Sequence, residues 1–229
     1  MQKNTIEDIC LFGRVDVIMG TLLGDACIYK RLRSNKVKVD SEVYAFSFSQ
    51  HSEEFCKWKA DLIGLPYRIY RRSRFDNRTQ KTYIAYDCHI RMPKVIASHY
   101  YNLFYRPRKM VSMEVLNNLT DLSVAIWYMD DGCMYYNGNN CHLTLSTDGF
   151  LLDDTILIIE WFKNNYGINF KYHRGAIRLT SNIECLKFMG IVEKYIPECM
   201  EYKILSKAKG KYNNQLSDER KKNRNIRYR

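Results

Sequence analysis

The sequence lacks the features that would assign it at once to a secreted, zinc-binding or membrane class. Its eight cysteines form no CxxC pair, and Cys88-His89 and Cys141-His142 have no second pair at zinc-finger spacing. No charged start followed by an apolar core marks a signal peptide, so we expect reduced thiols inside a cell. No apolar run approaches the ~18 residues that a membrane span needs. A disulfide-framed, zinc-finger or membrane-embedded protein is therefore not expected.

The chain does have enough apolar residues for a core, together with an excess of positive charge. Hydrophobic residues make up 46% of its 229 residues and aromatic residues 14%, which suits one large domain or two small ones. The net charge of +11 favours an anionic partner, nucleic acid before membrane. Residues 203–229 hold ten Lys/Arg against two acids, whereas the rest holds 26 against 23. The tail therefore carries most of the charge, as a nucleic-acid-binding arm or as a solubilising end.

Helix and strand patterns occur twice in the same order. The first half is expected to contain helix 15–23, strands 26–32 and 43–50, helix 53–63, strands 67–72 and 82–91 around a polar turn at 74–81, and helix 95–105. The second half is expected to contain helix 122–131, strands 133–136 and 141–147, helix 153–166 capped by Asp153 or Asp154, strands 169–174 and 176–180 around Gly175, and helix 184–195. Phe55, Trp58 and Leu62 are expected on one stripe of helix 53–63.

This repetition predicts a mixed α+β fold in which one αββαββα unit is duplicated in tandem with pseudo-twofold symmetry. The period of about 106 residues is too long for a solenoid. We expect a first half at 1–106, a linker at 107–118, a second half at 119–205 and a basic tail at 206–229.

A carboxylate stands at the end of the first helix of each half, Asp25 in one and Asp131 in the other. A negative charge there faces the unfavourable end of the helix dipole. If the two helices pack side by side, their carboxylates also repel each other. A divalent cation between them would offset both costs, and hard oxygen ligands suit Mg²⁺. Gly20 and Gly24 lie on one helix face and would let the partner helix approach closely.

Each of these features is common when it occurs alone. Gly24-Asp25 is an ordinary helix end, and Asp130-Asp131-Gly132 is an ordinary turn. Their occurrence after an apolar helix and before a strand, in both halves, favours a functional role over a structural one.

Residues 18–26, IMGTLLGDA, and residues 124–132, VAIWYMDDG, resemble the two nonapeptides of the LAGLIDADG homing endonucleases. The chain is similar to the double-motif, single-chain members, over roughly four-fifths of its length. The resemblance implies that the two motif helices form an interface between the halves and that the strands form antiparallel, saddle-shaped sheets over DNA. It also implies that the last Asp of each motif, Asp25 and Asp131, binds metal, with the backbone carbonyls of Gly24 and Asp130 as further ligands.

By motif register Asp131 is the ligand and Asp130 is a flanking residue. The second motif departs from the first where Ile126 replaces Gly20, so close helix approach rests on Gly20 and Gly24. The resemblance implies Mg²⁺ as cofactor, Mn²⁺ as a substitute, and Ca²⁺ as an ion that supports binding without cleavage.

Four further residues match catalytic positions. Lys109 and Lys203 match the active-site lysines of the family and would stabilise the charge of the transition state. Gln50 and Thr147 end matching strands, on the faces of Phe46-Phe48 and Leu143-Leu145, and such residues position water in the family. The alternatives are that Lys109 is a solvated linker lysine, that Lys203 is the first lysine of the basic tail, and that Gln50 and Thr147 are solvated strand ends.

A two-stranded β-ribbon fits the major groove of DNA, where polar side chains read base edges. The expected base-reading residues are Ser47, Ser49, Arg68, Tyr70, Arg72, Thr144, Ser146, Lys171, His173, Arg178 and Thr180. The expected phosphate contacts are Lys30, Arg31, Arg33, Lys36 and Lys38. Half of any solvent-facing strand is polar, so the set as a whole carries more weight than its members.

The sequence thus predicts a monomeric, Mg²⁺-dependent endonuclease that makes double-strand breaks in a long, asymmetric DNA site. One alternative is an intron RNA maturase on the same fold, alone or in addition to cleavage. A second is a non-catalytic DNA-binding regulator, against which the two intact carboxylates argue. The expected location is intracellular, in a bacterial or phage-infected cytoplasm or in an organelle.

Overall fold

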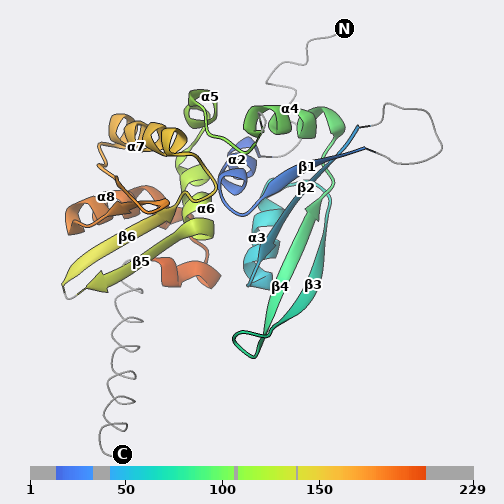
Figure 1. Cartoon of the computed structure of the whole chain (residues 1–229), viewed down its shortest axis with the longest axis horizontal. Coiled ribbons are helices and arrows are strands. Elements are labelled where there is room, and N and C mark those ends of the chain that lie inside the picture. Colours follow the sequence, from blue (N-terminus) through green and yellow to red (C-terminus); the bar gives the residue numbers. More distant parts are fainter. Residues whose placement is uncertain (1–13, 33–41, 106–107, 138, 205–229) are drawn as a thin grey trace, which may run out of the picture. The chain divides into compact units, whose positions relative to one another are not determined.

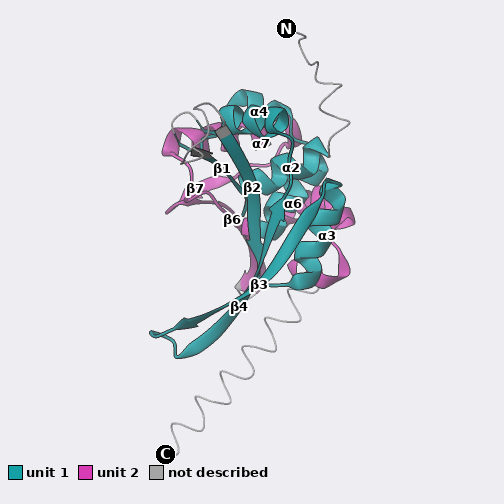
Figure 2. Ribbon diagram, turned by 90° about the vertical axis from the view of Figure 1, so that its right-hand side faces the viewer, with its two compact units in different colours: residues 1–130 teal, residues 131–229 magenta. Residues whose placement is uncertain are grey.

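A computed structural model of the chain describes residues 14–32, 42–105, 108–137 and 139–204 (Figure 1). The chain divides into two compact units, residues 1–130 and residues 131–229, which Figure 2 colours separately. The predicted mixed α+β class is confirmed, with the order αββαββα occurring twice. The predicted limits of the halves and of the linker stay predictions, and the basic tail lies outside the described residues. None of the described helices is long and apolar enough to span a membrane.

The first unit contains one four-stranded antiparallel sheet in the order β1-β2-β4-β3. Its elements are α2 (Val15–Leu23), β1 (Cys27–Leu32), β2 (Glu42–Gln50), α3 (Glu53–Ile63), β3 (Tyr67–Asp76), β4 (Lys81–Ile90) and α4 (Lys94–Phe104). A short helix, α5 (Met113–Asn117), lies within the segment expected to be a linker, and α6 (Asp121–Asp131) ends at the unit boundary.

Side-chain alternation along the strands gives this sheet one apolar face. Phe46, Phe48 and Cys88 are buried on that face, and α3 and α4 both contact its strands (Figure 1). Ser52 caps the start of α3 by accepting a hydrogen bond from the Phe55 N–H at 3.2 Å. Gly64 ends the helix with a φ of +74°, a conformation that glycine adopts without steric cost.

The β3–β4 hairpin is longer than expected. The predicted polar turn at 74–81 is wrong, since strand pairing continues into most of that segment. Arg74, Phe75 and Asp76 belong to β3 and pair with Tyr83, Thr82 and Lys81 of β4. Only residues 77–80 form the turn, which Asp76 closes by accepting hydrogen bonds from two backbone N–H groups. Both faces of this end of the hairpin are exposed, so it lacks the apolar alternation by which a half-buried strand is identified.

The second unit repeats the plan with a sheet in the order β5-β6-β8-β7. Its elements are β5 (Gly132–Asn137), β6 (Asn140–Ser146), α7 (Leu152–Tyr166), β7 (Lys171–His173), β8 (Ala176–Leu179), α8 (Asn182–Val192) and the 3₁₀ helices η1 (Glu193–Tyr195) and η2 (Glu198–Lys203). Arg174 and Gly175 both have positive φ, +47° and +76°, as a two-residue hairpin turn requires.

Two predicted helix ends in this unit need correction. Leu151, not Asp153 or Asp154, is the N-cap of α7, and both aspartates lie in the first turn instead. There they stabilise the helix through its dipole rather than through a capping hydrogen bond. The helix predicted at 184–195 ends at Val192 and continues as η1, because the last turn tightens to 3₁₀ geometry.

Candidate active site

The end of α2 lies against α6 at two glycines in the first unit. A Cβ atom on Gly20 would lie 2.9 Å from the Cα of Ser123, and one on Gly24 would lie 2.6 Å from the Cβ of Asp130. The Ser123 hydroxyl donates a hydrogen bond to the Asp16 carbonyl at 2.8 Å. Neither glycine has room for a side chain, so the two helices approach at backbone distance.

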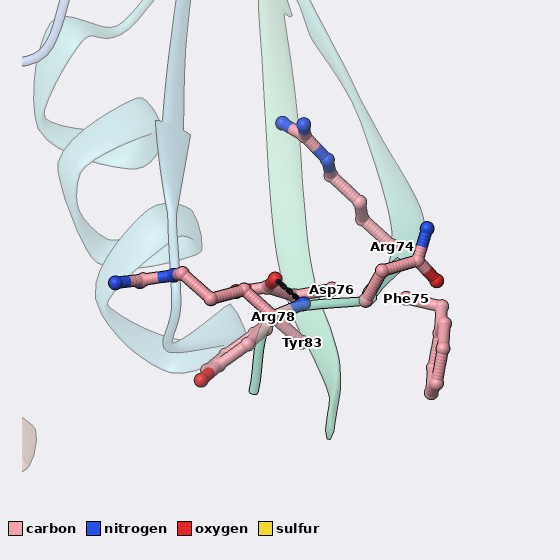
Figure 3. A pocket seen from close by; sticks show the side chains of 6 residues that line it. Arg74, Phe75, Asp76, Arg78 and Tyr83 are labelled. Carbon is pink, nitrogen blue, oxygen red and sulfur yellow. Dashed lines mark hydrogen bonds between the residues drawn. The ribbon is translucent and has the colours of Figure 1, made fainter. Parts of the chain in front are cut away.

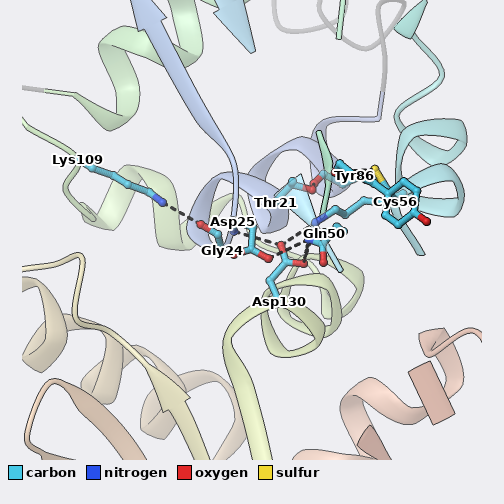
Figure 4. A network of polar contacts seen from close by, with 10 residues as sticks. Thr21, Gly24, Asp25, Gln50, Cys56, Tyr86, Lys109 and Asp130 are labelled. Carbon is cyan, nitrogen blue, oxygen red and sulfur yellow. Dashed lines mark hydrogen bonds and ion pairs between the residues drawn. The ribbon is translucent and has the colours of Figure 1, made fainter. Parts of the chain in front are cut away.

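Asp25 follows Gly24, the C-cap residue of α2, and it is exposed. The buried Gln50, the last residue of β2, donates from Nε2 to Asp25 Oδ2 at 2.8 Å (Figure 4). The same nitrogen donates to Asp130 Oδ1 at 3.0 Å. An amide NH₂ has two hydrogens, so one side chain holds both carboxylates. Gln50 occupies the expected face of β2, and its amide is directed at Asp25.

Asp130 is withdrawn from solvent and paired with a buried lysine. The Lys59 ammonium, from α3, lies 2.7 Å from Oδ1 and 2.9 Å from Oδ2 of Asp130, and both side chains are 0% exposed. Burial raises the pKa of Asp130, the Lys59 charge opposes that rise, and the Asp25 carboxylate adds to it. Asp130 Oδ2 also accepts the backbone N–H of Asp25 at 3.3 Å. Asp130 is thus a buried anchor beside Asp25.

Lys109 reaches the same helix end from the segment after α4. Its Nζ donates to the carbonyl oxygen of Gly24 at 3.0 Å and to that of Leu23 at 3.5 Å (Figure 4). These carbonyls belong to the C-terminal end of α2, where a cation is favoured by the helix dipole. The predicted catalytic lysine therefore lies next to the residue that precedes Asp25.

In the second unit, the residues predicted at the other centre make different contacts. Asp131 ends α6 and is partly exposed. Lys203 in η2 donates a hydrogen bond to the carbonyl of Gly132, the residue after Asp131. Thr147 is buried, and its hydroxyl donates to the Gly175 carbonyl at 3.1 Å. Lys203 therefore binds the residue that follows Asp131, whereas Thr147 is bound to the β7–β8 turn.

The strand register places the expected base-reading residues of the first unit on one face. Directly paired residues of an antiparallel sheet share a face, and Ser47 pairs with His89, which pairs with Arg68. Ser49 and Tyr70 are linked in the same way through Asp87, whose carboxylate forms an ion pair with Arg72 at 2.8 Å. This face is opposite the one that α3 and α4 cover.

The expected phosphate contacts are placed less favourably. Lys30 is exposed but pairs with Tyr44, so it lies on the opposite face from Ser47. The side chains of Arg31, Arg33, Lys36 and Lys38 lie outside the described part of the chain.

The second sheet has the same kind of face. Thr144 pairs with Arg178, which also pairs with Lys171, and Ser146 pairs with Ala176, which also pairs with His173. Thr180 is exposed and follows the end of β8. Each unit therefore presents polar and basic side chains on one sheet face.

The tip of the β3–β4 hairpin carries a basic and aromatic hollow of about 620 Å³ (Figure 3). It is lined by Arg74, Phe75, Asp76, Asn77, Arg78 and Tyr83. Phe75 is 54% exposed and Tyr83 43% exposed. The tip was not among the predicted contact residues, although its arginines and aromatic residues are of the types that bind nucleic acid.

Sequence reasoning also missed Lys59. A signal was present, because Lys59 follows Phe55 by four residues and precedes Ile63 by four. A lysine on an apolar helical stripe requires a buried acidic partner or a path to solvent.

Two αββαββα repeats, each with an aspartate at or just after the end of its first helix, define the class of fold. A sequence profile of the LAGLIDADG DNA endonuclease family matches residues 15–184. The chain therefore belongs to the LAGLIDADG DNA endonuclease family, and the predicted membership is confirmed.

Curated relatives and a solved structure agree with this assignment. The chain is 26% identical over 198 residues to "Probable intron-encoded endonuclease 1" of Wickerhamomyces canadensis, covering 83% of each chain. It is 22% identical over 213 residues to "Protein RecA" of Mycobacterium gastri, covering 86% of this chain and spanning only 48% of that relative. The homing endonuclease I-WcaI, solved bound to its DNA recognition sequence, matches with a TM-score of 0.67 at 21% identity, over 90% of this chain and 95% of that one. At that identity the likeness shows the fold.

Proposed function

We propose that the chain is a divalent-metal-dependent endonuclease that cuts both strands of a long, asymmetric DNA site as a monomer. The observation that carries the proposal is the position of Asp25, an exposed carboxylate after α2 that Gln50 holds at 2.8 Å. Family membership supports the same class of reaction. The second motif supplies its own carboxylate in Asp131, and a second centre is what cutting two strands requires.

The residues that would hold the metal are Asp25 and Asp131, with the carbonyl oxygens of Gly24 and Asp130 as further ligands. All are oxygen donors, which suits Mg²⁺ or Mn²⁺. Within the described ranges, no group of three or more His, Cys, Asp and Glu side chains is placed to hold a metal ion by itself. Mg²⁺ commonly takes several of its ligands from water and phosphate. When bound, the metal supplies charge stabilisation at the scissile phosphate and makes the attacking water more acidic.

The chain's own side chains orient and balance charge around this chemistry. Gln50 fixes one oxygen of Asp25, which leaves the lone pairs of the other oxygen for a ligand. Lys109 and Lys203 donate to the backbone carbonyls of Gly24 and Gly132, the residues that neighbour Asp25 and Asp131 in sequence. We propose that they stabilise the negative charge that develops on the phosphate.

Target recognition is assigned to the polar sheet faces. The candidates for base contacts are those predicted from the sequence in β2, β3, β6, β7 and β8, whose shared faces the register supports. The phosphate contacts predicted at residues 30–38 and the arm at 206–229 remain proposals.

The first experiment is a selection from a randomised DNA pool in Ca²⁺, followed by addition of Mg²⁺ to the enriched pool. We expect discrete double-strand cuts within a site of about 20 base pairs, and sedimentation of the complex as one protein per DNA. Asp25→Asn and Asp131→Asn are expected to bind the selected site in Ca²⁺ and to lose double-strand cleavage in Mg²⁺.

The other outcomes contradict the proposal. Tight sequence-specific binding without cutting by the parent would favour a regulator. A lack of any DNA selection, with binding of intron RNA, would favour a maturase. If both Asn variants cut as fast as the parent, the carboxylate assignment would be wrong.

A further inference from the structure

Lys59 has no part in the proposed reaction, yet its buried ammonium binds Asp130. Asp130 in turn accepts hydrogen bonds from Gln50 and from the backbone of Asp25. We infer that Lys59 is a positioning residue for the Asp25 centre, acting through Asp130 and Gln50. The inference rests on the proposed function and adds to it a dedicated support for one of the two centres.

The burial of this lysine is complete and its contacts are specific. Its side chain is 0% exposed, and the ammonium lies 4.5 Å from the ring centroid of Phe48 and 5.1 Å from that of Phe55. Both oxygens of Asp130 are within 2.9 Å of it. Desolvating two charges is costly, and apolar residues of similar volume would stabilise such a site at least as well. Stability alone therefore does not account for an ion pair here.

What the ion pair provides is a fixed acceptor for the groups around Asp25. Asp130 Oδ1 accepts from Gln50 at 3.0 Å, and Oδ2 accepts from the Asp25 backbone N–H at 3.3 Å. The amide of Gln50 bridges this anchor to the Asp25 carboxylate. Two carboxylates that share one amide repel each other, and the positive charge of Lys59 offsets that repulsion. Lys59 thereby holds Gln50, and Gln50 holds Asp25.

Among the residues that the structure describes, the second unit has no equivalent set. The buried positions of α3 and α7 follow the same spacing: Phe55, Cys56, Lys59 and Ile63 in one, and Asp154, Thr155, Ile158 and Phe162 in the other. Ile158 therefore corresponds to Lys59. The strand register matches Thr147 to Gln50, and the motif register matches Gly24 of the first motif to Asp130 of the second. Ile158 and Gly24 have no polar side-chain atoms, and the Thr147 hydroxyl is bound to Gly175. These equivalent positions therefore build the support at the Asp25 centre and not at the Asp131 centre, and the loss of Lys59 is expected to affect one strand of the DNA.

The test is a strand-resolved cleavage assay on the selected target, with each strand labelled separately and protein in excess. Gln50→Ala identifies the strand that depends on the Asp25 centre. Lys59→Met is expected to slow cutting of that same strand by about 10–100-fold relative to the other, as a misplaced catalytic group does. Its affinity for the target in Ca²⁺ is expected to match that of the parent. Ile158→Met, the matched core change in α7, is expected to leave the ratio of the two strand rates unchanged.

Two further measurements separate positioning from folding. If Lys59→Met fails to fold, the double variant Lys59→Gln with Asp130→Asn removes the unpaired charge and keeps a hydrogen bond. The amide introduced by Asp130→Asn would offer one acceptor oxygen where the carboxylate offers two, so the same strand bias is expected at a smaller size. A folded variant that cuts the strands in the parent ratio, or slows both equally, overturns the inference alone. A parent that makes no cut overturns the proposed function and this inference with it.

Discussion

The ammonium of Lys59 lies 2.7 Å from Oδ1 of Asp130, and neither side chain reaches solvent. Removing one partner would leave the other as an uncompensated buried charge, at a cost of about 3–5 kcal/mol. We therefore expect Lys59→Met to lower the free energy of unfolding by about 3 kcal/mol or more, measured by urea denaturation.

The exposed ion pair between Arg14 and Asp16, at a similar distance of 2.8 Å, is the control for that measurement. Arg14 is 52% exposed, and such surface pairs contribute about 0–1 kcal/mol. Arg14→Met is expected to stay within this range. Equal losses for the two variants would show that burial does not distinguish the pairs.

The contact between α2 and α6 depends on the absence of a side chain at Gly20. A Cβ atom there would lie 2.9 Å from the backbone Cα of Ser123, which has no rotamer by which to move away. Gly20→Ala is therefore expected to cost about 1–3 kcal/mol of folding free energy, as overpacking does. Gly190 in α8 is the control, because nothing lies within 4 Å of its added Cβ. Gly190→Ala is expected to stabilise by about 0.5–1 kcal/mol through helix propensity, and thermal unfolding measures both.

Much of the fold could be predicted because its signals are local. Helix α3 matches the predicted range 53–63, since Ser52 caps one end and Gly64 in a left-handed conformation marks the other. The tight β7–β8 turn was predictable from Gly175. The tip of the β3–β4 hairpin was not predictable, because strand pairing continues there without a buried face to impose alternation. Cross-strand hydrogen bonding leaves no trace in hydrophobic periodicity.

The candidate site was predicted in part, for a similar reason. Asp25, Gln50 and Lys109 could be identified as candidates by their places at element ends and by motif register, and the structure brings them together in the first unit. Lys59 was missed because the expected stripe of α3 ran through Trp58 and Leu62. The buried stripe instead runs through Phe55, Cys56, Lys59, Ala60 and Ile63. The partner that makes a buried lysine tolerable lies 71 residues away in sequence, so no local pattern could reveal it.

The β3–β4 tip is expected to contribute charge to DNA binding without taking part in cleavage. Arg74 and Arg78 line the hollow at this tip, and both residues are exposed. If each neutralises one phosphate, Arg74→Ala with Arg78→Ala should flatten the slope of log affinity against log salt by about 2. The single-turnover cutting rate at saturating protein is expected to stay at the parent value. Lys163 is an exposed lysine in α7, and Lys163→Ala is the control for losing one positive charge elsewhere on the surface. A salt slope that the double variant leaves unchanged would show that the tip is not part of the DNA interface.

Glu184 gives the second unit an acid-sensitive contact. Its Oε2 accepts the Asn169 backbone N–H at 3.0 Å, and this hydrogen bond, helped by the Lys187 charge, holds the pKa of Glu184 below its usual value. A carboxylate whose pKa is lower in the folded state contributes stability above its unfolded pKa of about 4.3, and loses it as pH falls through the folded value.

Glu184→Gln keeps an acceptor but no charge, so it should lower the free energy of unfolding at pH 7 by about 0.5–1 kcal/mol. The gap between variant and parent should close below about pH 4. Chemical denaturation at pH 7, 5 and 3 measures this, and a gap that does not change with pH would mean that the contact does not depend on the carboxylate charge.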